Sequence, residues 1–146
     1  MGACIRLPTC RRAGFAVADL IMRGVLDRHR DLRFGVVELF SAWVPLLLVT
    51  LDGRFSFYEQ FGGRPLAELA MRPRDYSRRQ VRLASFGFER PALLAALAGD
   101  LFMFGSDWPH REGLRCPVED FVASCGQSPE SVPTLYEANT RWLLGS

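Results

Sequence analysis

The chain has 146 residues with 49% hydrophobic and 23% charged content, which favours one folded globular domain and argues against disorder. The formal net charge is only +2, and the 18 basic residues, all arginines, are interleaved with 16 acidic residues, so no nucleic-acid partner is expected. The longest apolar run, residues 43–50, is too short to cross a bilayer, so no membrane partner is expected either.

The predicted elements alternate between helices and short apolar strands. Residues 1–13 predict an irregular lead-in, and residues 15–27 carry apolar side chains at helical spacing. Short apolar runs predict three strands, at residues 32–38, 80–86 and 101–104. Further helices are expected at residues 41–51, 55–61, 66–71, 89–97, 118–124 and 130–144, with Asp52-Gly53 ending the first of them and a polar turn at 75–79.

Strands that are apolar on both faces and separated by helices predict parallel pairing in an α/β fold. Three such strands form a strip of sheet, whereas a closed (β/α) barrel typically takes about 250 residues. If the fold is a barrel, we therefore expect this chain to form only part of it.

The cysteines suggest a compartment but no metal site. Cys4, Cys10, Cys116 and Cys125 form no CxxC pair, and the chain has only two histidines, so a Cys/His zinc module is not expected. Cys4 and Cys10 could pair in an oxidising compartment, but nothing else in the sequence indicates secretion. We therefore expect a cytoplasmic protein with reduced thiols.

The segment FGSDWPHREG, residues 104–113, is the strongest candidate for a functional site. An aspartate just past the carboxyl end of a buried parallel strand lies where α/β folds bind ligands, and Asp107 holds that position. Trp108 and His110 follow it and are expected to line a pocket. The alternative is that Asp107 only caps the next turn while His110 packs or faces solvent.

GSDWPH after an apolar strand resembles the final-strand signature of the amidohydrolase-related family that includes the aminocarboxymuconate semialdehyde decarboxylase-like enzymes. The stretches GVLDRHRDLRFGVVELFSAWVP, RPRDYSRRQVRLASF and EANTRWLLG are similar, in the same order, to the family's segments around its sixth strand, its seventh strand and its closing helix. The resemblance covers roughly residues 14–145. It implies that residues 14–146 form the C-terminal part of a TIM-like (β/α) barrel, with the last three strands and their helices.

The resemblance also implies a divalent metal, usually zinc, at the carboxyl ends of the strands, where it makes a water molecule nucleophilic. Asp107 matches the family's last-strand aspartate, which contacts the metal or its water and carries the proton. His110 matches the histidine of the motif and would lie at the pocket edge. The family takes its remaining ligands from an His-x-His pair and a further histidine, which this chain lacks, so we expect it to bind metal poorly alone.

Two more residues are candidates for substrate binding. Glu38 ends the first predicted strand, at the pocket rim, where it would bind substrate, orient a ligand or carry a proton. The alternative is a buried glutamate paired with an arginine such as Arg82. Trp43 is interpreted as pocket wall or core. His29 and Tyr76 precede strands and are expected at the opposite end of the sheet, in structural or solvent-facing positions.

Together with these residues, the resemblance implies a metal-dependent hydrolase or decarboxylase that acts on a small carboxylated or amide substrate. It also implies that this chain is only part of the enzyme. Two alternatives remain: a truncated remnant without catalysis, and an assembly subunit that needs another chain to complete the barrel. The open edges of an apolar parallel sheet favour a homo-oligomer or a complementing chain as partner.

Overall fold

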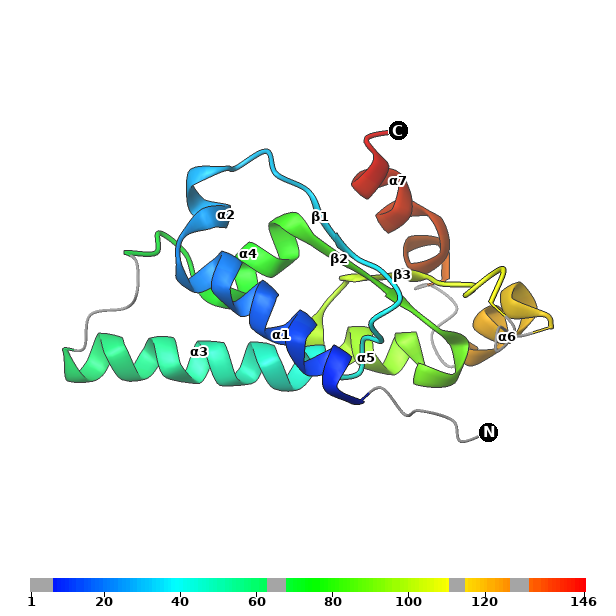
Figure 1. The fold of residues 1–146 in the computed structure, drawn as a ribbon, viewed down its shortest axis with the longest axis horizontal. Helices are drawn as coiled ribbons and strands as arrows, with labels where there is room; N and C mark the ends of the chain where they lie inside the picture. Colours follow the sequence, from blue (N-terminus) through cyan, green and yellow to red (C-terminus); the bar gives the residue numbers. More distant parts are fainter. Residues whose placement is uncertain (1–6, 63–67, 111–114, 127–131) are drawn as a thin grey trace.

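The computed structural model describes residues 7–62, 68–110, 115–126 and 132–146. Three strands, β1 (Phe34–Val36), β2 (Val81–Ser85) and β3 (Phe102–Phe104), form one parallel sheet in the order β1-β2-β3 (Figure 1). The register places Val36 opposite Leu83 and Leu83 opposite Phe102. The predicted α/β class is confirmed, with all three strands running in the same direction.

The main core lies between this sheet and the helices that precede or connect its strands. These helices are α1 (Leu7–Met22), the short α2 (Val25–Arg28), α3 (Val44–Phe61), α4 (Pro73–Gln80) and α5 (Pro91–Ala98), with the 3-10 turn η1 (Gly87–Glu89) before α5. Ile21, Leu48, Leu83 and Phe102 are at most 1% exposed and belong to one apolar cluster. Burial of this apolar surface is the main force that holds the helices on the sheet.

The C-terminal helix packs on the opposite face of the sheet, near the strand starts. After α6 (Pro117–Ser124), the π-helical turn η3 (Thr134–Ala138) leads into α7 (Asn139–Leu144) (Figure 1). Leu143 of α7 lies so close to Gly35 that a Cβ on Gly35 would stand 2.7 Å from its Cδ2. The Arg82 guanidinium carbon lies 4.0 Å from the centroid of the Trp142 ring. Glycine at position 35 therefore allows α7 to approach β1.

Two helices are longer than predicted. Helix α1 begins at Leu7, although residues 1–13 were expected to be irregular, because Pro8 is tolerated in the first turn of a helix; residues 1–6 lie outside the described part. Helix α3 continues through Asp52-Gly53, because an interior glycine costs only about 1 kcal/mol. The Asp52 carboxylate is instead used across helices, accepting the Arg74 backbone N–H at 3.1 Å.

The polar segment 75–79, expected to be a turn, lies within α4. Polar side chains such as these are expected at the surface, but one side of this helix is buried: Tyr76, Ser77 and Gln80 are all at most 2% exposed. Gln80 Nε2 donates to the carbonyl oxygen of His29 at 2.6 Å. Residues 68–71 form no helix, and residues 66–67 and 130–131, where two other helices were expected to begin, lie outside the described residues.

Tyr76, expected in a solvent-facing position, is fully buried. Its hydroxyl donates to Asp27 Oδ1 at 2.8 Å and accepts the backbone N–H groups of Ala70 and Met71 at 2.9 and 3.2 Å. Burial raises the pKa of Tyr76 above its ordinary value of 10.0, and the hydrogen bond to Asp27 raises it by a smaller amount. Both effects favour the neutral phenol in the folded chain.

Because the folded pKa of Tyr76 is raised, its contribution to stability is complete below pH 10.0 and is lost as the pH rises through the folded value. We expect the free energy of unfolding of the parent chain to fall between about pH 9 and about pH 11. Tyr76→Phe should show a flatter loss over that range, from a starting value lower by about 1–2 kcal/mol. Urea unfolding across the range measures both, with Tyr58→Phe as the control. Equal slopes in all three proteins would contradict the assignment.

In the described part of the chain, no helix combines the length and the apolar character needed to cross a membrane.

Candidate functional site

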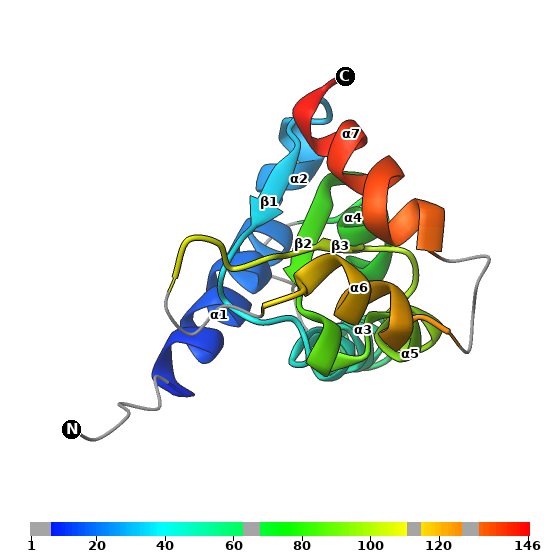
Figure 2. The same cartoon turned by 90° about the vertical axis from the view of Figure 1, so that its right-hand side faces the viewer.

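Three potential metal ligands meet just beyond the carboxyl ends of β1 and β3. Glu38 lies two residues after β1, and Asp107 and His110 lie in the segment after β3. One ligand atom from each of the three lies within 4.8 Å of the others. Figure 2 views the molecule from this side, where the segments that follow β1 and β3 lie close together. The predicted strand-end position of Asp107 is therefore observed, and Glu38 joins it.

The segment after β3 folds back so that His110 meets Asp107. His110 Nδ1 lies 2.7 Å from Asp107 Oδ1, and the His110 backbone N–H donates to the Asp107 carbonyl oxygen at 2.9 Å. The Trp108 backbone N–H donates to Ser106 Oγ at 3.2 Å, and the Trp108-Pro109 peptide bond is cis. The side chain of Asp107 is 22% exposed and that of His110 is 48% exposed. The pair is open to solvent on the histidine side, so it is accessible to a ligand.

The backbone at the site is held in a conformation that L-residues rarely adopt. Glu38, Phe40 and Asp107 have φ angles of 61°, 56° and 59°, in the left-handed region. Aspartate tolerates this region, but glutamate and phenylalanine adopt it at a cost on the order of 1 kcal/mol each. Such conformations persist only where surrounding contacts impose them, and they cluster at functional sites. The turn that carries Glu38 is therefore held by its neighbours.

Trp43 is one of those neighbours. Its indole Nε1–H donates to the carbonyl oxygens of Leu39 and Phe40 at 3.1 and 3.0 Å. Its ring packs partly buried against the core, and a Cβ on Gly14 of α1 would lie 3.4 Å from it. Of the two interpretations given to Trp43, pocket wall and core, the structure places the ring against the core and its N–H on the Glu38 turn.

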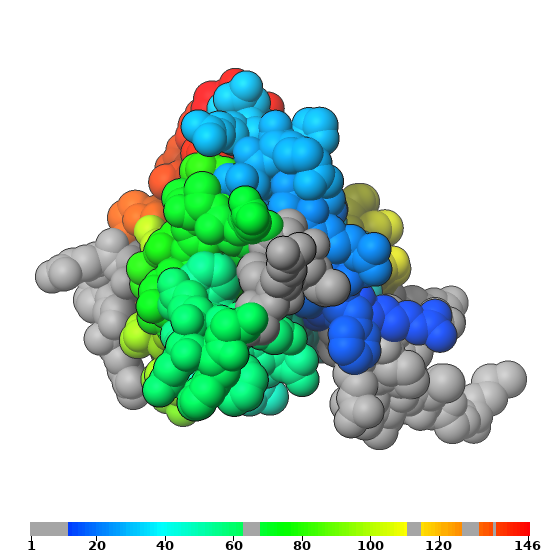
Figure 3. Space-filling model, turned by 90° about the vertical axis from the view of Figure 1, so that its left-hand side faces the viewer, coloured from blue at the N-terminus to red at the C-terminus, as the bar shows by residue number. Residues whose placement is uncertain are grey.

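Trp108, predicted to bind substrate, is 81% exposed beside Asp107. The interpretation of Glu38 as a buried partner of Arg82 is wrong, because Glu38 is exposed and Arg82 Nε donates to Asn139 Oδ1 at 2.6 Å. His29 is exposed and precedes β1, whereas Glu38 follows that strand, so β1 separates His29 from the site, as predicted. Figure 3 shows the face opposite the one in Figure 2, with the blue atoms around α2 at the surface.

The donor set suits a divalent cation. Two carboxylates and one imidazole offer the oxygen and nitrogen ligands that zinc and similar ions bind, and three protein ligands leave one position open in a tetrahedral catalytic site. Two ligands of a tetrahedral zinc ion lie about 3.4 Å apart when each bond is about 2.1 Å. The Asp107–His110 separation of 2.7 Å is shorter, so the pair must open slightly for both of these atoms to bind one ion.

The sequence predicted Glu38 at the pocket rim but not as a metal ligand. The available signal was that Glu38 and Asp107 both follow parallel strands, whose carboxyl ends share one edge of the sheet. It also missed Glu89, whose carboxylate accepts backbone N–H groups from the turn after Glu38. No sequence pattern would have shown that contact, because it joins residues 47 and 48 positions apart.

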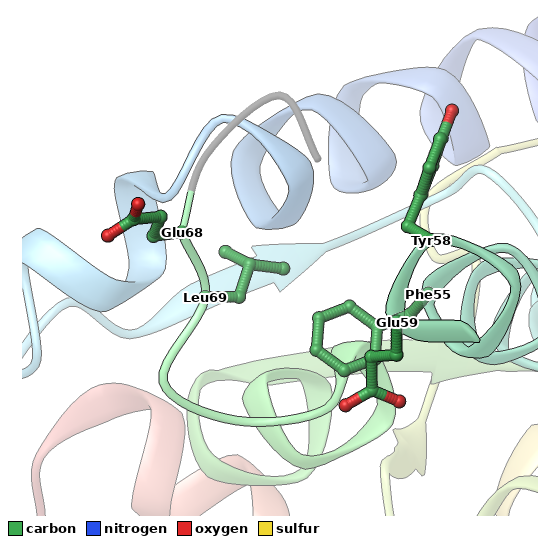
Figure 4. A pocket seen from close by; sticks show the side chains of 5 residues that line it. All are labelled: Phe55, Tyr58, Glu59, Glu68 and Leu69. Atoms are coloured by element: carbon green, nitrogen blue, oxygen red, sulfur yellow. The ribbon is translucent and has the colours of Figure 1, made fainter. Parts of the chain in front are cut away.

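A separate pocket lies beside α3, with a volume of about 230 Å³ and five lining residues, Phe55, Tyr58, Glu59, Glu68 and Leu69 (Figure 4). None of these residues belongs to the group formed by Glu38, Asp107 and His110. The pocket is therefore distinct from the candidate site.

No family model matches this chain, and no curated protein matches it. Among solved structures, the chain is similar to the crystal structure of the amidohydrolase map2389c from Mycobacterium avium subsp. paratuberculosis K-10, with 30% sequence identity and a TM-score of 0.75. The match covers 94% of this chain but only 34% of that protein, so the chain spans about a third of its length. In fold and in sequence, the chain is therefore similar to about a third of this amidohydrolase.

Proposed function

We propose that this chain supplies part of the active site of a metal-dependent amidohydrolase that acts on a small carboxylated or amide substrate. In this proposal Glu38, Asp107 and His110 hold a divalent cation, with zinc as the first choice. The observation that carries the proposal is their convergence beyond the ends of two parallel strands, within 4.8 Å of one another. Ligands bind at this end of the strands in (β/α) barrels.

A divalent cation at this position would polarise the substrate and supply a nucleophilic water near neutral pH. Asp107 would accept the proton released during attack, because an ionised carboxylate has only acceptor oxygens. His110, whose Nδ1 lies 2.7 Å from Asp107 Oδ1, would bind the cation beside that carboxylate. Trp108, 81% exposed beside Asp107, would contact the substrate.

The finer assignment within the amidohydrolases remains part of the proposal. The segment GSDWPH, residues 105–110, resembles the decarboxylase-like enzymes, so the reaction is either hydrolysis or decarboxylation. These differ in product, because decarboxylation releases carbon dioxide whereas hydrolysis adds water. Further ligands would come from strands that pair with the outer edges of β1 and β3. In the pattern of the family, these ligands are histidines.

A metal titration tests the proposal. We expect the chain to bind one Zn²⁺ ion with a dissociation constant of about 1 µM or weaker, since a complete zinc site holds its metal much more tightly. Isothermal titration calorimetry with the purified chain measures the constant and the stoichiometry. A chain that binds no Zn²⁺, Mn²⁺ or Co²⁺ at millimolar concentration would contradict the proposal.

A second candidate function is an assembly subunit that completes its barrel with another chain. Within the described residues, β1 and β3 each pair on one side only, and Val37, just past β1, is 56% exposed. Unpaired strand edges with apolar side chains promote association. Light scattering after size-exclusion chromatography should then give a mass above 16.4 kDa, the mass of one chain. A monodisperse, folded monomer would exclude assembly with a second copy of this chain.

A further inference from the structure

We propose that Glu89 is a positioning residue of the candidate site, whose carboxylate locks the turn carrying Glu38 onto the end of β2. Glu89 itself is not a member of the ligand group, which in the described residues comprises Glu38, Asp107 and His110. Its effect on the metal rests on the function proposed above, whereas its effect on the turn can be measured without any metal.

The Glu89 carboxylate bridges two segments that are distant in the sequence. Its Oε1 accepts the backbone N–H groups of Ser41 and Ala42 at 2.7 and 3.0 Å, in the turn between β1 and α3. Its Oε2 accepts the backbone N–H of Phe86 at 3.1 Å, directly after β2. Hydrogen bonds to an ionised acceptor are roughly twice as strong as those between neutral groups. One side chain therefore fixes the ends of two neighbouring strands relative to each other.

The turn that Glu89 binds needs such support. Glu38 and Phe40 hold left-handed φ angles of 61° and 56°, which these residue types do not favour in isolation. Ser41 is fully buried, so its backbone N–H has no access to bulk water and depends on Glu89 for a partner. Without that partner, the preferred backbone conformations of the turn would move Glu38 away from Asp107.

An aromatic cluster joins the same two segments. The rings of Phe40 and Phe86 meet edge to face at 5.8 Å, and those of Phe86 and Phe88 stack at 5.5 Å. Apolar contacts of this kind hold the segments together but are not directional enough to set a backbone angle. The directional restraint therefore comes from the three hydrogen bonds to Glu89.

Two substitutions of Glu89 separate this role from a general effect of charge. Glu89→Gln replaces one carboxylate oxygen with an amide donor, so one of the two segments loses its acceptor. Glu89→Asp keeps the negative charge but shortens the side chain by one methylene group, so it cannot reach both segments. Glu137→Gln is the matched control, because Glu137 is exposed and contacts only Arg141 of its own helical segment among the described interactions.

We expect both Glu89 variants to lower the affinity for Zn²⁺ by about tenfold, as is typical for residues that orient metal ligands. Hydrogen exchange should show faster exchange at the amides of Ser41, Ala42 and Phe86 in both variants, with core strands still protected. Unchanged exchange at Ser41 and Ala42 in the variants would overturn the proposal. If the parent chain binds Zn²⁺, an unchanged affinity in the variants would overturn it as well. If Glu89→Gln does not fold, Glu89→Asp carries the test.

The two proposals fail in different ways. A parent chain that binds no divalent ion contradicts the proposed function, yet the exchange of the three amides still decides whether Glu89 locks the turn. Affinity that is kept in Glu89→Asp but lost in Glu89→Gln would show that charge alone matters, and would also overturn the positioning role. Glu137→Gln should match the parent chain in both measurements.

Discussion

Asp107→Asn is expected to lower the affinity for Zn²⁺ by about 100-fold or more, since even residues that only orient metal ligands typically contribute 10- to 100-fold. The substitution removes the charge that would attract the ion and weakens the contact with His110, now 2.7 Å from Asp107 Oδ1. Asparagine tolerates the left-handed φ of 59° at this position, so the backbone should not change. Calorimetric titration of the parent and variant chains measures the loss.

Asp19→Asn is the matched control for that experiment. Asp19 of α1 is 63% exposed, forms an ion pair with Arg23 just after that helix, and is not a member of the ligand group. Its replacement should leave the affinity for Zn²⁺ unchanged. If Asp107→Asn binds the ion as tightly as Asp19→Asn does, Asp107 is not a ligand. Urea unfolding of both variants should show stability within about 0.5 kcal/mol of the parent chain.

Asn139→Ala is expected to lower the free energy of unfolding by about 3 kcal/mol. Asn139 is 4% exposed, and its Nδ2 donates to the Phe102 carbonyl oxygen at 2.7 Å while its Oδ1 accepts from Arg82 Nε at 2.6 Å. The variant leaves the carbonyl of Phe102, the first residue of β3, and the half-buried Arg82 guanidinium without these partners. Burial already lowers the pKa of Arg82, partly offset by Asp100, so the loss of a hydrogen bond to its charged form is costly.

Urea unfolding followed by tryptophan fluorescence measures this change, because Trp142 lies against Arg82 and reports on the same contact. Thr140→Ala is the control, since Thr140 is the next residue of α7 and is only partly buried. We expect it to cost less than about 1 kcal/mol. A similar loss in both variants would mean that α7 is stabilised by packing alone.

Much of the fold could be predicted because each strand lies within a short apolar run of the sequence. The runs at 32–38, 80–86 and 101–104 contain β1, β2 and β3, although the strands are shorter than the runs. The parallel pairing follows from strands that are apolar on both faces. Helix α4 could not be found this way, because Tyr76, Ser77 and Gln80 bury polar atoms whose partners lie on other elements.

In the candidate site too, local features could be predicted from the sequence, whereas contacts between distant elements could not. Asp107 could be singled out because one short segment contains the strand, the exit and the carboxylate. The meeting of Glu38 with Asp107 and His110 could only be suspected, since it depends on the distance between two strand ends separated by β2. The support from Glu89 and Trp43 could not be inferred at all, because backbone groups that accept or donate leave no mark in the sequence.

The amino-acid sequence by itself therefore determined the α/β class, the three strands and the position of Asp107 at the end of the last of them. Hydrophobic periodicity and strand-end position are local properties, so the order of residues is enough to reveal them. The tertiary structure alone decided that α7 covers the second face of the sheet, that Arg82 pairs with Asn139 instead of Glu38, and that Glu89 holds the Glu38 turn. These contacts depend on the distances between packed elements, which only the folded chain defines.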